Sequence, residues 1–273
     1  MPSLAGPLLL AGGGRMGSAL LAGWLAAGLP AAEAFVVEPD PDRSAELCRA
    51  HGVTAVARPA ELPASLVPRA LLLAVKPQVM DAALADYVER VGPDTLVLSI
   101  AAGKPISTFE RAFGGERAVV RAMPNTPAAV GQGATVLCAN SATRPAQRAL
   151  ADALLAAVGE VYWIEDEELM HAVTAMSGGG PAYVFLLIET LAAAGARLGL
   201  PQELAMRLAR ATVAGAGELA RRSAEPAAEL RRNVTSPGGT TQAALAVLMA
   251  PDGIGPLVDR ALGAAAARSR ELA

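Results

Sequence analysis

The stretch LLLAGGGRMG, residues 8–17, decides how the first half of the chain folds. Its apolar residues have the character of a short buried strand, and a helical pattern at Ser18–Ala27 follows its glycines. The match to G-x-G-x-x-G therefore sits in the strand–turn–helix context that gives this motif meaning. Gly12 would make the tight turn, Gly14 would let a pyrophosphate approach the backbone, and Gly17 would let the helix pack on the strand. We expect a dinucleotide-binding loop made of Gly12, Gly13, Gly14, Arg15, Met16 and Gly17.

An acidic residue follows the next predicted strand. This strand, Ala34–Val37, ends at Glu38, about 20 residues after the glycine loop, where the ribose-binding acid of such sites is expected. Glu38 would accept hydrogen bonds from a ribose diol, and Glu38 and Asp40 would repel a 2′-phosphate. The sequence therefore predicts a nicotinamide cofactor, NADH or NADPH, with NADH favoured.

Strand and helix patterns alternate as far as Ile164, which predicts a mostly parallel sheet with helices on both faces. We expect helices at 41–51, 81–91, 107–113 and 146–158, and strands at 54–57, 71–75, 96–100, 119–123, 135–138 and 161–164. Ligands of such sheets bind beyond the carboxyl ends of the strands. The loops expected there are Ala74–Gln78, Ala101–Gly103 and Met123–Pro127, and we expect them to form the rim of a nicotinamide pocket.

The second half of the chain has only helical patterns, at 166–198, 201–222, 227–233, 241–249 and 255–270. We therefore expect an α/β Rossmann-type domain over residues 1–164 and an all-α domain over residues 165–273. The segment Tyr183–Ile188 is apolar on all sides, so we expect it to be buried in a larger assembly rather than in a monomer.

Two glycine-rich segments interrupt these helices. Ser177–Pro181 holds three glycines and a proline, which predicts a broken helix with Pro181 at the first position of the second part. The break would leave bare backbone amides beside the Ser177 hydroxyl; close helix–helix packing at glycine is the alternative. Thr235–Thr241 places glycine backbone and threonine hydroxyls at a helix start, which predicts an anion site, most simply for a carboxylate. An ordinary helix cap with a turn is the alternative there.

Composition excludes several classes of function. The net charge of −3 shows no block of one sign, which argues against a nucleic-acid partner. Two cysteines and two histidines, unclustered, predict no metal site and suit a reducing compartment. No uninterrupted apolar run reaches the ~18 residues of a membrane span, and no lysine or arginine precedes Arg15 as in a signal peptide. We expect a cytoplasmic protein that has no membrane partner.

The sequence resembles the pyrroline-5-carboxylate reductase family nearly from end to end. The resemblance rests on GGGRMG (12–17), AVKPQ (74–78), AAG (101–103), MPNTP (123–127), AVTAMSGGGPAY (172–183) and NVTSPGGTT (233–241), of which the last two are the specific ones. It implies a Rossmann domain and a helical domain whose copies interleave in a homodimer, with dimers associating into larger rings such as a decamer. It also implies reduction of (S)-1-pyrroline-5-carboxylate to L-proline by NAD(P)H in proline biosynthesis.

The resemblance also implies the roles of site residues. Thr241 would hold or protonate the imine nitrogen, and Ser177 would line the substrate cavity beside it. The substrate would further contact the backbone of Gly178, Gly179 and Gly180, while its carboxylate would be held by Ser236 and by the amides of Gly239 and Thr240. The cofactor would be bordered by Ala74, Val75, Lys76, Pro77, Ala101, Ala102, Gly103 and Asn125, with Asn233 closing over it.

The chain departs from the family pattern at four positions, two of them inside the motifs quoted above. Gly179 stands where a second serine is usual, and Arg15 stands in the glycine loop where asparagine or glutamine is common. Pro59 replaces an asparagine that contacts the adenosine half. His171 replaces a common aspartate, and we expect it to have a surface or capping role. These changes bear on cofactor affinity and substrate fit, not on the class of reaction.

Two other functions stay open at this point. A reductase of a related cyclic imine acid, such as 1-piperideine-2-carboxylate, would need the same combination of ring imine and carboxylate recognition. A non-catalytic NAD(P)-binding regulator could keep the fold, although the retained Thr241 and both glycine-rich segments argue against it.

Overall fold

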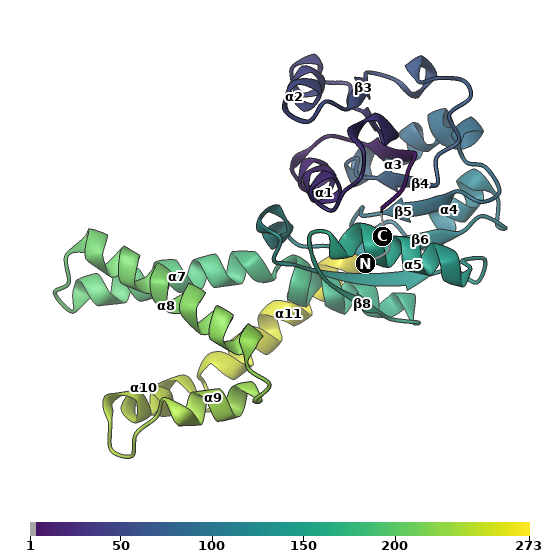
Figure 1. Cartoon of the computed structure of the whole chain (residues 1–273). Helices are drawn as coiled ribbons and strands as arrows, with labels where there is room; N and C mark the ends of the chain where they lie inside the picture. The colour runs from purple at the N-terminus through teal and green to yellow at the C-terminus, as the bar shows by residue number, and fades with distance from the viewer. Residues whose placement is uncertain (1–3) are drawn as a thin grey trace. The chain divides into compact units, whose positions relative to one another are not determined.

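The computed structural model describes residues 4–273, and its first half is built on an eight-stranded sheet (Figure 1). The sheet order is β3-β2-β1-β4-β5-β6-β7-β8, and every neighbouring pair is parallel except β6 with β7. This confirms the predicted, mostly parallel sheet. The strands are β1 (Leu8–Ala11), β2 (Ala34–Val37), β3 (Thr54–Val56), β4 (Ala70–Leu73), β5 (Leu96–Ser99), β6 (Val119–Met123), β7 (Gly133–Ala139) and β8 (Gly159–Trp163).

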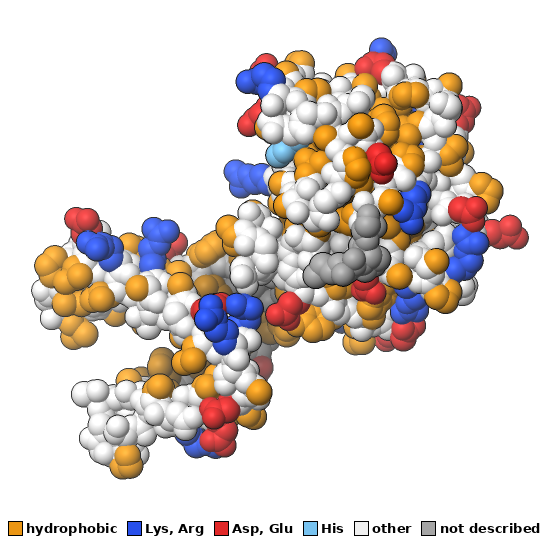
Figure 2. All heavy atoms as spheres, in the orientation of Figure 1, with side chains coloured by type: hydrophobic (Ala, Val, Ile, Leu, Met, Phe, Trp, Pro, Cys, Tyr) orange, Lys and Arg blue, Asp and Glu red, His pale blue; other side chains and the backbone are white. Residues whose placement is uncertain are grey.

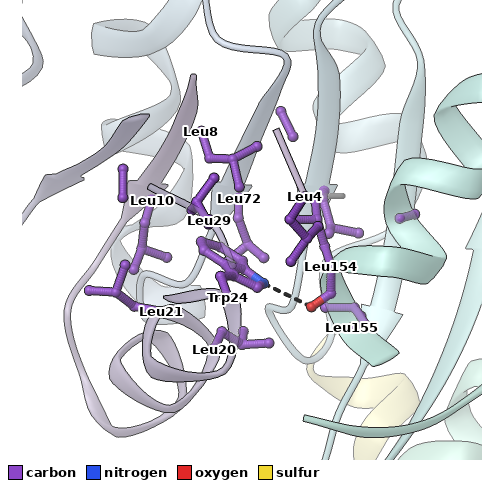
Figure 3. Packing of buried hydrophobic residues seen from close by; sticks show 14 of the residues in the cluster. Leu4, Leu8, Leu10, Leu20, Leu21, Trp24, Leu29, Leu72, Leu154 and Leu155 are labelled. Carbon is purple, nitrogen blue, oxygen red and sulfur yellow. Dashed lines mark hydrogen bonds between the residues drawn. The ribbon is translucent and has the colours of Figure 1, made fainter. Parts of the chain in front are cut away.

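Helices cover both faces of this sheet because the buried strands are apolar on both sides. In β1, Leu8 and Leu10 pack with helices α1, α2 and α5, whereas Leu9 and Ala11 pack with α3 and α4. The first cluster centres on Trp24, whose Nε1 donates to the carbonyl oxygen of Leu154 at 2.8 Å (Figure 3). The helices are α1 (Arg15–Ala26), α2 (Pro41–His51), α3 (Pro77–Leu84), α4 (Ile106–Phe113) and α5 (Pro145–Ala156).

Two of these helices begin earlier than the patterns predicted. Helix α1 begins at Arg15, directly after Gly14, so the end of the glycine loop already belongs to the helix. Helix α3 begins at Pro77, whose fixed φ suits a first helical turn, and gives way to a 3₁₀ helix at Ala85–Arg90.

The described chain divides into two compact units. One holds the sheet, the residues up to Gly178 and the segment Ala266–Ala273; the other is Gly179–Ala265. The predicted boundary after residue 164 marks the end of the strands, whereas the units divide later because the segment after β8 packs against the sheet. Met170, for example, is fully buried in the cluster beneath α3 and α4.

The second unit is all helical, as predicted. Its helices are α7 (Gly180–Arg197), α8 (Gln202–Arg222), α9 (Ala227–Asn233), α10 (Thr240–Leu248) and the first part of α11 (Ile254–Glu271). Helices α7 and α8 lie side by side, with Gly195 facing Ala205 (Figure 1). The apolar segment at 183–188 is not covered in this unit, since Phe185 is 57% and Leu186 61% exposed. Figure 2 shows hydrophobic side chains at the surface of these helices.

The predicted break at Ser177–Pro181 is confirmed, since a second helix, α7, begins at Gly180 with Pro181 in its first turn. Residues Thr174–Gly178 form a π-helical turn between α6 (Met170–Val173) and α7, and Gly179 keeps helical dihedral angles. A regular α-helix would drive the ring of Pro181 against the carbonyl of Ser177, four residues earlier. In this chain the π turn and Gly179, which lies between the π turn and α7, precede Pro181 in place of a regular α-helical turn.

Candidate functional site

The glycine loop has the geometry that its motif predicts. Gly12 has φ +99° and donates its amide to the carbonyl of Val37 at 2.8 Å, which ties the loop to the end of β2. A side chain at Gly17 would overlap the carbonyl oxygen of Gly12. Helix α1 can therefore pack on the loop only if residue 17 is glycine. A side chain at Gly14 would meet no atom within 4 Å. The backbone at Gly14 is therefore open to a ligand.

The carboxylate of Glu38 is built into this loop. It is 6% exposed, and it accepts hydrogen bonds from the amide of Gly13 at 2.8 Å and from the amide of Asp40 at 3.0 Å. Asp40 in turn caps α2, accepting from the amide of Asp42 at 3.0 Å and from that of Arg43 at 3.3 Å. A negative charge is therefore fixed at the end of β2, beside the glycine backbone.

Two hollows lie near the ends of the first strands, and one of them borders the glycine loop. One, of about 370 Å³, is lined by Gly13, Gly14, Arg15, Ser18, Arg43, Glu46, Leu47, Ala50 and His51. The other, of about 460 Å³, lies beyond the ends of β2, β3 and β4 and includes Pro39, Arg58, Pro59, Val75 and Tyr87 in its lining. Burial raises the pKa of Tyr87, so its phenol stays neutral. Sequence patterns missed Arg58 and Tyr87; the position of Arg58 two residues after the end of β3 is the signal that could have found it.

The loops after β1, β4 and β5 lie next to one another. The amide of Ala74 donates to Ala11 at 2.8 Å, and the amide of Ile100 donates to Leu73 at 3.1 Å. The segment Ala74–Pro77 therefore runs between the glycine loop and the segment Ala101–Gly103. Ala102 and Lys76 are exposed at this edge, while Ala101 and Gly103 are buried. The structure thus brings the predicted cofactor residues of the first unit to one edge of the sheet.

Asn125 and Ser177 meet although they lie far apart in the sequence. Asn125 Nδ2 donates to the carbonyl oxygen of Ser177 at 3.3 Å and lies 3.4 Å from its Oγ. The amide of Ala134 donates to Asn125 Oδ1 at 2.9 Å, which fixes the orientation of the asparagine. Gly178 follows directly, and a side chain there would overlap the end of Met123. The MPNTP loop after β6 therefore packs against the π turn.

The remaining predicted site residues belong to the helical unit. They are Gly179, Gly180, Asn233, Ser236, Gly239, Thr240 and Thr241. Gly238 has φ +71°, and the amide of Gly239 donates to the carbonyl of Ser236 at 3.0 Å, which closes a turn before α10. That amide is therefore not free for an anion, and this part of the sequence prediction needs correction. The free donors are the amides of the first turn, at Thr240 and Thr241.

Two further observations concern the side chains of Thr241 and Asn233. Thr241 is exposed, and within residues 4–273 its hydroxyl makes no hydrogen bond. Asn233 Nδ2 donates to Glu225 Oε2 at 3.0 Å. Among the described residues, no group of three or more histidine, cysteine, aspartate or glutamate side chains could hold a metal ion.

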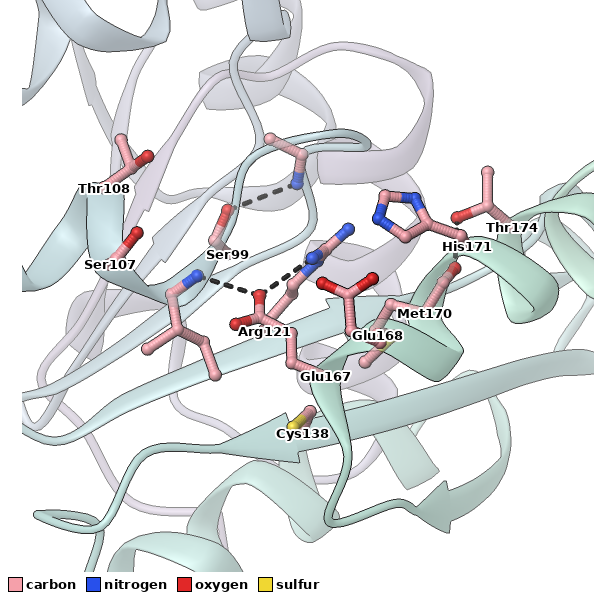
Figure 4. Close-up of polar contacts among 12 residues, drawn as sticks. Ser99, Ser107, Thr108, Arg121, Cys138, Glu167, Glu168, Met170, His171 and Thr174 are labelled. Carbon is pink, nitrogen blue, oxygen red and sulfur yellow. Dashed lines mark hydrogen bonds and ion pairs between the residues drawn. The ribbon is translucent and has the colours of Figure 1, made fainter. Parts of the chain in front are cut away.

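An ion pair fixes the segment that leads into the π turn. The guanidinium of Arg121, on β6 and 4% exposed, lies 2.8 Å from Glu167 Oε1 (Figure 4). The same oxygen accepts a hydrogen bond from the amide of Ile106 at 2.9 Å.

Burial raises the pKa of the nearby Cys138 thiol, so this cysteine stays protonated in the core.

Comparison with known proteins adds family relationships to this geometry. Residues 167–272 match the family model of pyrroline-5-carboxylate reductase dimerisation, and residues 8–103 match that of coenzyme F420-dependent NADP oxidoreductases. The chain is 44% identical over 262 residues to the pyrroline-5-carboxylate reductase of Pseudomonas aeruginosa, covering 96% of this chain and 95% of that relative. It is also 44% identical over 262 residues to that of Synechocystis, covering 96% of both.

Solved structures give the same relationship. A pyrroline-5-carboxylate reductase from Coxiella burnetii matches with a TM-score of 0.92 and 34% identity over 98% of both chains. A Plasmodium falciparum pyrroline carboxylate reductase with NADP bound matches with a TM-score of 0.82 and 31% identity over 97% of both chains.

Fold and matches together define an NAD(P)H-dependent oxidoreductase with a Rossmann-type domain and a helical dimerisation domain. Within that class, the chain belongs to the pyrroline-5-carboxylate reductase family.

Proposed function

We propose that this protein reduces (S)-1-pyrroline-5-carboxylate to L-proline in the cytoplasm, as a step of proline biosynthesis. One observation carries the proposal. This member of the family has an open glycine loop, and the Thr241 hydroxyl is exposed and makes no hydrogen bond in the described chain. NADH or NADPH, when bound, supplies the hydride that adds to the imine carbon. Reduction then requires a proton at the imine nitrogen, which a small hydroxyl group can deliver or hold.

The residues of the first unit fit such a cofactor. The open backbone at Gly14 and the first amides of α1 would receive the pyrophosphate. The adenosine half would occupy the hollow beyond β2, β3 and β4, where Pro59 lies. Ala74–Pro77, Ala101–Gly103 and Asn125 would border the nicotinamide.

The start of α10 fits the substrate carboxylate. The amides of Thr240 and Thr241 belong to the first turn, where unpaired donors and the helix dipole favour a negative charge. The turn closed by Ser236 and Gly239 holds these donors in place. As the resemblance to the family implies, Thr241 would offer its hydroxyl to the ring nitrogen, and Ser177 and Gly178–Gly180 would line the substrate cavity. No histidine or metal ion is required, because positioning of two reactants supplies much of the rate.

The identity of the cofactor follows from Glu38. Its carboxylate is fixed by Gly13 and Asp40 and cannot swing away without leaving two amides unpaired. A fixed negative charge at this place accepts ribose hydroxyls and repels a 2′-phosphate. We therefore propose that NADH is preferred over NADPH.

The experiment that tests the function is NADH oxidation, followed by absorbance, with and without pyrroline-5-carboxylate. Oxidation that depends on the imine, with proline as product, is the expected result. The same assay with 1-piperideine-2-carboxylate tests the alternative substrate: a higher kcat/KM with the six-membered ring would move the assignment there. If neither imine causes oxidation while NADH still binds, the protein is a cofactor-binding regulator.

A further inference from the structure

The end of helix α11 packs against the unit that carries the cofactor loops. Residues Ala266–Ala273 belong to this unit, although α11 begins at Ile254 in the other one. The Ser269 hydroxyl lies 2.9 Å from Nδ1 of His171, and each side chain is only 6% exposed. The expected surface or capping role of His171 is therefore wrong. Separation of this pair would leave two desolvated polar atoms, so the hydrogen bond fixes α11 in place.

Directly after α11, Leu272 meets the loop that follows β5. Gly103 has φ +76°, and a side chain there would lie 2.9 Å from the carbonyl oxygen of Leu272. The loop and the end of α11 thus approach as closely as glycine allows. Both border one cavity of about 390 Å³, which is lined by Pro77, Gln78, Ala102, Gly103, Lys104, Thr174, Ser269 and Leu272.

The following residues of the loop are held from other directions. Lys104 Nζ lies 2.8 Å from Asp81 Oδ2, and the amide of Ile106 donates to Glu167 Oε1 at 2.9 Å. Figure 4 shows Glu167 and His171 on the same segment, facing this region. The chain beyond Gly103 is therefore anchored, and the contact with α11 restrains the part of the loop that comes before it.

We propose that His171 and Ser269 are positioning residues for the nicotinamide cofactor. They fix the end of α11, which holds the segment Ala101–Gly103 in the conformation that presents Ala102 to the cofactor. This inference rests on the proposed function, in which that segment borders the nicotinamide. Loss of the hydrogen bond releases α11 and weakens cofactor binding, while the reacting groups on the substrate stay as they were.

The test compares Ser269→Ala and His171→Ala with the wild type. Both variants should raise the KM for NADH by about 3- to 10-fold, the effect of losing roughly one hydrogen bond, with kcat nearly unchanged. A fluorescence titration of NADH without substrate should show the same loss of affinity. Ser269→Thr keeps the hydroxyl and should restore binding. Ser141→Ala, at an exposed serine in the turn after β7, is the matched control and should change nothing.

A variant that ends at Glu271 guards against a folding defect. It lacks Leu272, whose side chain is 59% exposed but whose carbonyl oxygen and Cβ lie 2.9 and 3.6 Å from the position of a side chain at Gly103. The variant should also weaken NADH binding. Unchanged NADH affinity in the folded variants, whatever their thermal stability, would overturn the proposal. A wild type that binds NADH but reduces no imine would instead reject the proposed function, because the titration needs no substrate.

Discussion

At the scale of single residues, the proposed reaction places one hydroxyl, that of Thr241, at the imine nitrogen. Thr241 is the second residue of α10, exposed and without a hydrogen bond in the described chain. We predict that Thr241→Ala lowers kcat/KM for pyrroline-5-carboxylate by ~10- to 1000-fold, equivalent to ~1.4–4 kcal/mol of transition-state stabilisation. The affinity for NADH should change little, because the predicted cofactor residues other than Asn233 belong to the other unit.

Steady-state kinetics of Thr241→Ala and Thr241→Ser separate the hydroxyl from its surroundings. The serine variant keeps the hydroxyl and should lose much less activity than the alanine variant. Full activity in Thr241→Ala would remove this residue from the mechanism and would favour solvent as the source of the proton.

A second residue-scale prediction concerns Glu38 and Asp40. A 2′-phosphate within ~5 Å of either carboxylate costs roughly 1 kcal/mol per charge pair even in water-like dielectric. We expect NADH to be preferred over NADPH by ~5- to 100-fold in kcat/KM. Arg43, whose Nε lies 3.7 Å from Asp40, offsets part of the repulsion but remains paired with that acid. The measurement is kcat/KM with each cofactor at saturating imine, and equal or better efficiency with NADPH contradicts the expectation.

A double substitution tests the cause of this preference. Glu38→Ser with Asp40→Arg replaces both acids by groups that bind a phosphate, and it should move the preference toward NADPH. Glu38→Ser also removes the acceptor for the Gly13 amide, so some loss of activity with both cofactors is expected. The ratio of the two efficiencies is therefore the diagnostic quantity. An unchanged ratio would mean that these residues do not face the ribose.

At the scale of elements, the pair Arg121–Glu167 ties the start of the dimerisation region to strand β6. Glu167→Ala would leave the buried Arg121 charge unpaired, and we predict a loss of about 3 kcal/mol in the free energy of unfolding. Denaturant unfolding measures this. Glu168→Ala, at the exposed neighbour, is the control and should stay within about 0.5 kcal/mol of wild type. Equal losses in both variants would mean that Arg121 finds water or another partner.

Most elements of the first unit could be predicted because their patterns are strong and local. Strand β2 and helix α2 have the predicted bounds, since apolar residues and the turn residues Pro41 and Gly52 mark their ends. The glycine loop was predictable for the same reason. The residues of this motif are continuous in sequence, so they specify both the turn at Gly12 and the close packing at Gly17 without information from distant parts of the chain.

Two other features could not be predicted from local patterns. Three glycines and a proline at 177–181 predict where the helix is interrupted, but they do not predict that a π turn precedes the interruption. The contact of His171 with Ser269 joins positions about a hundred residues apart in the sequence. Helix α11 is uninterrupted, so its sequence does not indicate that its last residues pack with the first unit. Helix propensity depends on residues that are close together in the sequence, whereas both of these features depend on tertiary packing.

At the scale of the whole molecule, the apolar surface of α7 requires an explanation. The helical segment Glu167–Arg197 is long and apolar enough to cross a membrane by length and composition alone, and only 6% of its most apolar window is buried. Glu189 interrupts the apolar run within this segment, so no uninterrupted run has the length of a membrane span. The same segment lies within the match to the dimerisation model at residues 167–272, so a second subunit accounts for its exposed side chains.

We predict that the protein is an obligate, interleaved homodimer, whether or not dimers assemble further into a decamer. The exposed apolar residues on α7 and α8 have no covering element in the described chain, and an interface above the ~2,000 Å² typical of obligate pairs would bury them. Leu186→Arg should produce monomers or aggregates and abolish activity, because it places a charge in the centre of this surface. Val67→Arg is matched in exposure, at 60% against 61% for Leu186, but lies in the other unit and should remain dimeric and active. Sedimentation at nanomolar concentration gives the decisive measurement: a stable, active wild-type monomer would refute the obligate dimer and leave the apolar surface of α7 for another partner.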